Sequence, residues 1–212
     1  MSTVKTDLRK LKKSQQKNAS QLARNVAKHL FELESNNAAL KASLSTLHIN
    51  SVKKVTISPK RYAFVVFYSL RFIRRFRKIQ KALTQELEKK FPNTHIIFVA
   101  QRKIQAPPKS NLATRARSFT LTAVHDAVLD DIVFPAEIVG RRVHYKTDGS
   151  GTTQIFFDDK HRDITQAKLP TYAKLASKLT GRTCTFGYMS QPSLQQVSVK
   201  PAGAATTIGT AQ

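Results

Sequence analysis

Few residues in this sequence have the types and spacing that catalysis requires. His125-Asp126 has the order found in metal phosphohydrolases, but no second histidine lies near it. Its place beside the apolar positions of a predicted helix favours a partly buried structural histidine. The pairs Asp130-Asp131 and Asp158-Asp159 lack a third ligand at a suitable spacing, so a helix flank and a strand end explain them more simply than a cation site. Cys184 has no neighbouring histidine and is interpreted as a small core residue.

The glycine-containing segment 148–151 is the remaining candidate for ligand binding. It reads Asp-Gly-Ser-Gly and lacks the Gly-Lys-Ser/Thr signature of a phosphate-binding loop, so it predicts a turn. The sequence therefore predicts a protein that is not an enzyme and that needs no metal, cofactor or small-molecule substrate. The competing hypothesis is a nucleic-acid enzyme with an unfamiliar site, for which replacing His125 would abolish turnover.

The charge balance points to a polyanionic partner. The 212 residues include 36 Lys and Arg against 13 Asp and Glu, a formal net charge of +23. Residues 1–125 hold 26 of the basic residues and five of the acidic ones. Residues 35–85 contain 11 basic residues and no acid, although solvated surfaces normally mix both signs. Cationic surface that the chain does not neutralise itself fits nucleic acid.

Composition also restricts the compartment. A single cysteine excludes an internal disulfide and fits a reducing environment. The charged start has no apolar segment behind it, so it does not resemble a secretory signal. The longest apolar run, residues 62–70, is about half of the roughly 20 residues that a membrane-spanning helix needs. We therefore expect a soluble, intracellular protein without a membrane partner.

The most informative element is a helix predicted over residues 70–91. At about 100° per residue, its apolar residues fall within an arc of roughly 120°, and six cations occupy the remainder: Arg71, Arg74, Arg75, Arg77, Lys78 and Lys81. A cationic amphipathic helix could instead lie on acidic lipid or enter a calmodulin-like groove, but both alternatives need a free apolar face. Because predicted strands directly precede and follow this helix, we expect a protein core to cover that face.

The other elements alternate between helices and strands, which indicates the α+β class with one mixed, mainly antiparallel sheet packed with helices. We expect a basic, helical N-terminal arm at 1–19, one domain at 20–188 and a disordered tail at 189–212. The predicted helices, including a pair broken near Asn36-Asn37, cover residues 20–47, 120–133 and 172–179. The predicted strands cover residues 52–57, 62–68, 95–100, 138–147, 154–158 and 183–188, and an exposed loop covers 105–118.

Several segments resemble the eukaryote-specific family of small-subunit ribosomal protein seven. They are Arg77–Gln80, Glu86–Phe91, His95–Arg102, Lys178–Gly181 and above all the thirty-residue block Leu121–Ser150. The resemblance covers roughly residues 20–188. It implies an α+β structural component of the 40S subunit that binds 18S ribosomal RNA and neighbouring ribosomal proteins. It also implies a part in subunit assembly, with a cytoplasmic location and a nucleolar stage.

Charge and resemblance together give the predicted RNA contacts. They come from the arm, the helix, the end of the following strand and the loop: Lys10, Lys12, Lys13, Arg71, Arg74, Arg75, Arg77, Lys78, Lys81, Arg102, Lys103, Lys109, Arg115 and Arg117. The block at 121–150 has a net charge near zero, so we expect it to build the fold and meet protein neighbours. The main alternative is a free-standing RNA chaperone or translational regulator that uses the same cations.

Overall fold

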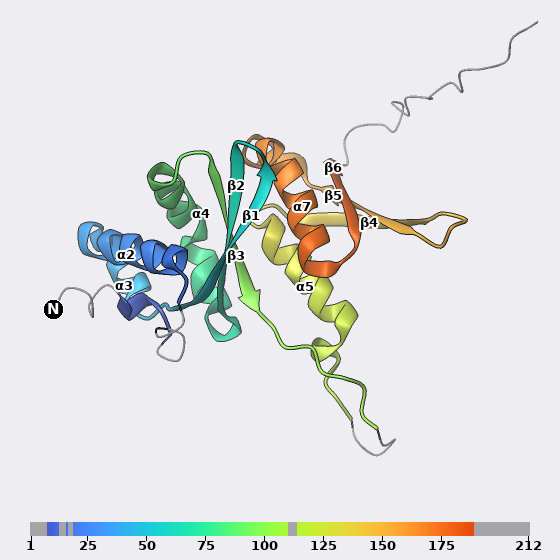
Figure 1. Cartoon of the computed structure of the whole chain (residues 1–212), viewed down its shortest axis with the longest axis horizontal. Coiled ribbons are helices and arrows are strands. Elements are labelled where there is room, and N and C mark those ends of the chain that lie inside the picture. The colour runs from blue at the N-terminus through green and yellow to red at the C-terminus, as the bar shows by residue number, and fades with distance from the viewer. Residues whose placement is uncertain (1–7, 13–15, 17–18, 110–113, 189–212) are drawn as a thin grey trace, which may run out of the picture.

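The computed structural model describes residues 8–12, 16, 19–109 and 114–188. It confirms the α+β class, with helices and strands alternating along the chain (Figure 1). The predicted tail at 189–212 and the predicted contact Lys13 lie outside the described residues.

Two helices follow the start of the chain, as the sequence predicts. Helix α2 spans Gln21–Asn36 and begins at Ser20, whose Oγ accepts the Ala23 N–H at 3.3 Å and caps the first turn. Helix α3 spans Ala38–Leu44, and the extended backbone of Asn37 separates the two helices.

Part of the predicted arm, residues 9–12, packs against the domain. Residues Leu8–Lys10 form the 3₁₀ turn η1, and Leu11 is buried and bridges to Ile49. Residues 9–12 therefore belong to the folded body, because an apolar side chain within the arm adds to its core.

The first sheet is built from the predicted hairpin and one later strand. Strands β1 (Ile49–Ser58) and β2 (Arg61–Ser69) pair antiparallel, and β3 (Thr94–Gln101) pairs parallel with β2. The crossover between β2 and β3 contains the 3₁₀ turn η3 (Leu70–Phe72) and helix α4 (Ile73–Lys90). Strand β3 is buried from Ile96 to Ala100, as expected for a continuous apolar strand covered on both faces.

The chain after β3 forms the second half of the fold. Residues Arg117–Phe119 form the 3₁₀ turn η4, and helix α5 follows at Leu121–Val133. Strands β4 (Ile138–Tyr145) and β5 (Gly151–Phe157) form the predicted antiparallel hairpin.

The last described elements complete the second sheet. A short helical stretch contains η5 (Asp159–His161), α6 (Arg162–Thr165) and η6 (Gln166–Lys168) and leads into α7 (Leu169–Thr180). Helix α7 ends at Gly181, whose φ of 71° suits a residue without Cβ. Strand β6 (Thr183–Tyr188) then pairs parallel with β5.

The prediction of one mainly antiparallel sheet needs correction. The described strands form two three-stranded sheets, ordered β1-β2-β3 and β4-β5-β6, and each contains one antiparallel and one parallel pair. In each sheet a hairpin is followed by a helical crossover and a parallel strand. Such a crossover fixes the third strand beside the second one, so each half of the chain completes its own sheet.

The elements form four layers, which Figure 1 shows in sequence from α2–α4 through the first sheet and α5–α7 to the second sheet. One apolar cluster joins Leu11, α2, α3 and α4 to one face of the first sheet. The other cluster joins the opposite face to α5, α7 and the inner face of the second sheet. The first sheet therefore organises both halves of the protein.

Candidate nucleic-acid interface

Helix α4 carries its buried and charged residues on opposite sides. Phe76, Leu83 and Leu87 are buried in the first apolar cluster. At about 100° per residue, Arg74, Lys78 and Lys81 lie about 180° around the helix from that buried stripe. All three cations are exposed. Packing of the apolar face therefore fixes the direction in which the cations point.

In the described part of the chain, the outward cations of α4 have no acidic partner. Within the described residues, no carboxylate forms an ion pair with Arg74, Lys78 or Lys81, nor with the exposed Arg71 of η3. Arg75 is exposed and donates from Nη1 to Thr46 Oγ1 at 3.2 Å, a neutral partner that leaves its charge in place. This surface can therefore bind an external anion without first breaking an ion pair.

The buried stripe also decides between the interpretations of the helix. Phe76 lies between Tyr68 and Phe98 in tilted ring contacts, with ring centroids 4.2 and 5.8 Å away. Insertion of α4 into lipid or into a calmodulin-like groove would have to expose this cluster, at a cost of several kcal/mol for the large side chains alone. The folded protein thus offers only the cationic side of α4 to a partner.

Lys10 is not available as an RNA contact. Its side chain is 4% exposed, with Nζ 2.7 Å from Glu34 Oε2 and donating to the Leu44 carbonyl. Burial of an ammonium group requires such partners, because the group loses its hydration. The prediction for Lys10 is therefore wrong, whereas Lys12, two residues later, is exposed.

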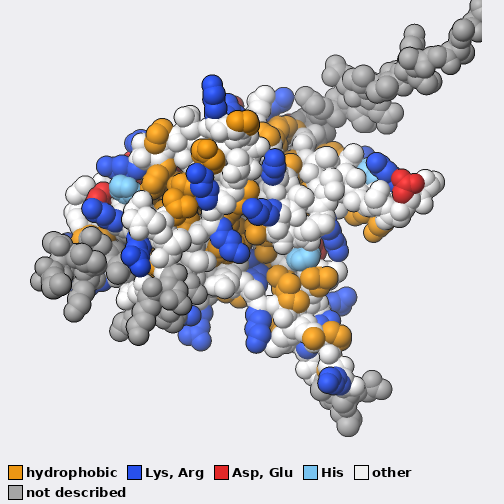
Figure 2. All heavy atoms as spheres, viewed as in Figure 1, with side chains coloured by type: hydrophobic (Ala, Val, Ile, Leu, Met, Phe, Trp, Pro, Cys, Tyr) orange, Lys and Arg blue, Asp and Glu red, His pale blue; other side chains and the backbone are white. Residues whose placement is uncertain are grey.

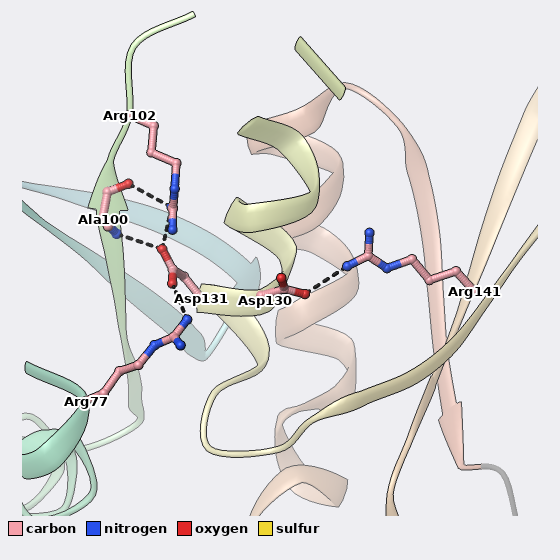
Figure 3. A network of polar contacts seen from close by, with 6 residues as sticks. All are labelled: Arg77, Ala100, Arg102, Asp130, Asp131 and Arg141. Atoms are coloured by element: carbon pink, nitrogen blue, oxygen red, sulfur yellow. Dashed lines mark hydrogen bonds and ion pairs between the residues drawn. The ribbon is translucent and has the colours of Figure 1, made fainter. Parts of the chain in front are cut away.

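Two predicted arginines converge on one buried acid, Asp131 of α5 (Figure 3). Arg102 is 10% exposed, and its Nη1 lies 2.5 Å from Asp131 Oδ2. The same Oδ2 accepts the Ala100 N–H at 3.1 Å, and Arg77 Nη2 lies 3.2 Å from Oδ1. Arg102 thus joins β3 to α5 and is unavailable to RNA, which corrects its assignment. Arg77 is 43% exposed and retains donors toward solvent.

The remaining predicted contacts lie after β3, along the segment that leads to α5. Lys103, Lys109 and Arg117 are exposed. Arg115 is half-buried and donates to the Gln105 carbonyl, which ties the two sides of this segment together. The cations here are separated from those of α4 in the sequence, and they give a second cationic region.

The predicted contacts omitted exposed cations on the first hairpin. Lys53 and Lys54 lie on β1, with Nζ 5.5 Å from the Phe67 ring centroid and 3.7 Å from the Tyr62 centroid. Lys60 and Arg61 lie at the turn between β1 and β2 and are also exposed. Figure 2 shows Lys and Arg side chains spread over the visible face, where Asp and Glu are scarce. The absence of acids at 35–85 was the signal for these residues.

The candidates for catalysis do not assemble into a site. No group of three or more His, Cys, Asp and Glu side chains suited to a metal ion occurs among the described residues. Burial, and secondarily the charge of Arg182, lowers the pKa of His125, whose buried Nδ1 has no hydrogen-bond partner in the described part of the chain. Burial raises the pKa of the Cys184 thiol. A neutral imidazole and a neutral thiol fit a structural role in packing.

The acidic pairs have structural explanations. Asp130 Oδ1 lies 2.8 Å from Arg141 Nη2, and a hydrogen bond from Lys160 lowers the pKa of the half-buried Asp158. Across the described part of the chain, no helix combines the length and apolarity that crossing a membrane requires.

Comparison with known proteins gives the relationship. The family model described as "Ribosomal protein S7e" matches residues 10–188. The chain belongs to the ribosomal protein S7e family. A relative from Avicennia marina, "Small ribosomal subunit protein eS7", is 42% identical over 184 residues, 86% of this chain and 97% of the relative. "Small ribosomal subunit protein eS7B" of Saccharomyces cerevisiae is 41% identical over 175 residues, 81% of this chain and 92% of the relative.

The S7e match confirms the resemblance read from the sequence. It spans η1 to β6 and so includes the cationic side of α4, the Asp131 ion pairs and both sheets. It ends at residue 188, where the described part of the chain also ends.

Proposed function

We propose that this S7e protein is a structural constituent of the small ribosomal subunit that binds 18S ribosomal RNA through the outward side of α4. The observation that carries the proposal is the orientation of this helix. Its apolar side is held in the core by Phe76 and Leu83, and its opposite side presents cations that have no acidic partner among the described residues. The names of the relatives, all small-subunit proteins, support the assignment to that particle.

Phosphate recognition suits this surface physically. Arg74 and Lys81 are seven residues apart, which corresponds to about 10 Å along a helix axis, so their side chains can contact several phosphates of one strand. Guanidinium groups bind phosphate oxygens in pairs, and each neutralised phosphate releases counterions. Because α4 is held by the core before binding, little ordering of its backbone opposes association.

The proposed RNA-binding set differs from the sequence prediction. It excludes Lys10 and Arg102, which are held inside the protein, and it adds the cations of the first hairpin. The described members are Lys12, Lys53, Lys54, Lys60, Arg61, Arg71, Arg74, Arg75, Arg77, Lys78, Lys81, Lys103, Lys109, Arg115 and Arg117.

The role is structural rather than catalytic. A subunit protein that holds RNA segments together contributes to assembly and to translation without a reaction of its own. We place it in cytoplasmic ribosomes, with a nucleolar stage while the subunit is being assembled. Neighbouring small-subunit proteins complete its set of partners.

The direct test is charge reversal on α4. Replacing Arg74, Arg75 and Lys78 together by Glu should leave the fold intact, because all three side chains are exposed. Binding to 18S RNA fragments, measured by filter retention from 50 to 200 mM salt, should weaken regardless of sequence. The slope of log affinity against log salt should become shallower by about three, one per lost phosphate contact. The affinity of the natural protein should then fall about 60-fold more than that of the variant over this range.

A control separates local contacts from overall charge. Replacing Lys146, Lys178 and Arg182 by Glu changes the net charge equally, but these exposed residues lie just after β4, on α7 and in the turn after α7. We expect a clearly smaller loss of affinity. Equal losses in both triple variants would contradict the assignment of α4 as the principal RNA contact.

Sedimentation tests the assignment to the subunit. The protein should remain with small subunits on a sucrose gradient after a high-salt wash, because many simultaneous contacts hold it. Release to the top of the gradient would instead favour a free-standing RNA chaperone or regulator, since isolated phosphate contacts weaken steeply with salt.

A further inference from the structure

Within the described residues, strand β4 has an unpaired outer edge. It is the first strand in the order β4-β5-β6, and its pairing within the described residues is with β5 alone. The Lys146 N–H donates to the Ser150 carbonyl at 2.9 Å, so this pair belongs to the hydrogen-bonded type of the antiparallel ladder. Because the two types alternate, Tyr145 and Val143 direct their backbone N–H and C=O groups away from β5.

The side chains on this edge are large, apolar and exposed. Val143 is 49% and Tyr145 78% exposed, and Val139 at the start of the strand is also exposed. The Tyr145 ring lies across Gly151 of the paired strand, where an added Cβ would approach Cε1 to 3.1 Å. The hairpin projects from the four layers (Figure 1). Exposed apolar edge strands invite pairing with another chain.

The charges around β4 favour protein over RNA. Arg141 lies 2.6 Å from Asp126 Oδ1 and 2.8 Å from Asp130 Oδ1, so its charge is neutralised. Arg142 lies over the Phe156 ring, 5.3 Å from its centroid. Arg142 keeps its charge, but within the described residues β4 presents fewer unpaired cations than α4, and its outer edge offers exposed apolar side chains together with backbone donors and acceptors.

We propose that β4 is the docking edge for an extended segment of a neighbouring small-subunit protein. The segment adds as a fourth strand beside β4, pairing its backbone with Val143 and Tyr145. Its apolar side chains, at every second position, cover the exposed side chains of these two residues. This inference rests on the proposed function, because the subunit supplies the neighbour. It assigns separate surfaces to RNA and to protein.

A backbone substitution tests the pairing itself. Val143→Pro removes the outward N–H, whereas Val143→Ala shortens the side chain and keeps the N–H. Proline is tolerated on edge strands where the lost N–H faced outward, so β4 should stay paired with β5. Retention in salt-washed small subunits should fall about tenfold more for the proline variant than for the alanine variant. Equal retention of the two variants would overturn the proposal.

A photocrosslink identifies the occupant even if the proline variant folds poorly. With p-benzoylphenylalanine in place of Tyr145, irradiated small subunits should yield a crosslink to one other ribosomal protein, sensitive to protease and resistant to ribonuclease. A crosslink mainly to RNA, a crosslink to a second copy of this chain, or none at all would each overturn the inference.

The two proposals fail in different assays. Binding of the free protein to 18S RNA fragments should be unchanged by Val143→Pro, because Val143 is not among the proposed RNA contacts. Loss of particle retention with intact RNA binding supports the docking edge. Unchanged RNA binding in the α4 triple variant would count against the proposed function alone.

Discussion

Replacing Asp131 by Asn tests how the two halves of the fold are joined. The Asp131 carboxylate is buried and has three donors, the Ala100 N–H, Arg102 and Arg77 (Figure 3). Asparagine preserves the size of the side chain but removes its charge. It also replaces one of the two oxygens that accept hydrogen bonds with an NH₂ group, which can only donate. At least one guanidinium group therefore loses its partner.

The expected magnitude follows from the exposure of the two arginines. Arg102 is 10% exposed, and loss of one partner of a buried ion pair costs about 3–5 kcal/mol. Arg77 is 43% exposed, so water can replace its contact and its share is below about 1 kcal/mol. We expect Asp131→Asn to lower the free energy of unfolding by about 3 kcal/mol. For a protein of this size that corresponds to about 6–12 °C in Tm.

The adjacent residue supplies the control. Asp130 is half exposed and pairs with Arg141 at the surface, so Asp130→Asn should cost less than about 1 kcal/mol. Urea unfolding followed by circular dichroism measures both variants. Adding Arg102→Met to Asp131→Asn should recover part of the loss, because the unpaired buried charge is removed. Equal losses for the two aspartates, or a larger loss in the double variant, would refute the reasoning.

Two further predictions concern the core and pH. Phe76→Ala should cost about 3–5 kcal/mol by urea unfolding, because the ring is fully buried between Tyr68 and Phe98; a loss below about 1 kcal/mol would contradict its place in the core. Burial, with the charge of Lys168 second, lowers the pKa of His95 below its ordinary 6.5, so the unfolded chain takes up the proton first and stability falls as the pH drops below that value. Melting temperatures from pH 7 to 5 should depend less on pH in His95→Gln than in the natural protein; an unchanged slope in His95→Gln would exclude this cause.

Local periodicity predicted most elements of the fold. The spacing of Phe76, Leu83 and Leu87 placed the buried side of α4 correctly, and the continuous run at 95–100 correctly indicated a strand covered on both faces. These successes share a cause, since a residue's burial within one helix or strand is set by its position in the repeat.

Strand order could not be read in the same way. The parallel pairs β2–β3 and β5–β6 join segments separated by a helical crossover. The local sequence of a strand does not indicate which other strand it pairs with. The single predicted sheet therefore became two. The short helical turns at 159–168 were missed as well, because three or four residues are too few to establish a repeat.

Charge type did not distinguish surface cations from structural ones. Lys10 and Arg102 have the same residue types as the exposed cations, but their partners Glu34 and Asp131 are distant in the sequence. A usable signal was the scarcity of acids. The chain has 36 basic and only 13 acidic residues. An acid near the core therefore has many cations available and forms ion pairs with one or two of them.

The two covered faces of the first sheet have a consequence for the nascent chain. When Gln101 has been synthesised, α2, α3 and α4 are complete and can cover one face, but α5 and α7 are still to come. Val65 and Val99 on the other face then stay open to water until Thr180 has been added. At about 5–20 residues per second, this interval is on the order of 4–16 seconds. A newly made chain therefore exposes an apolar face of the first sheet for a time that allows holdase chaperones to bind it.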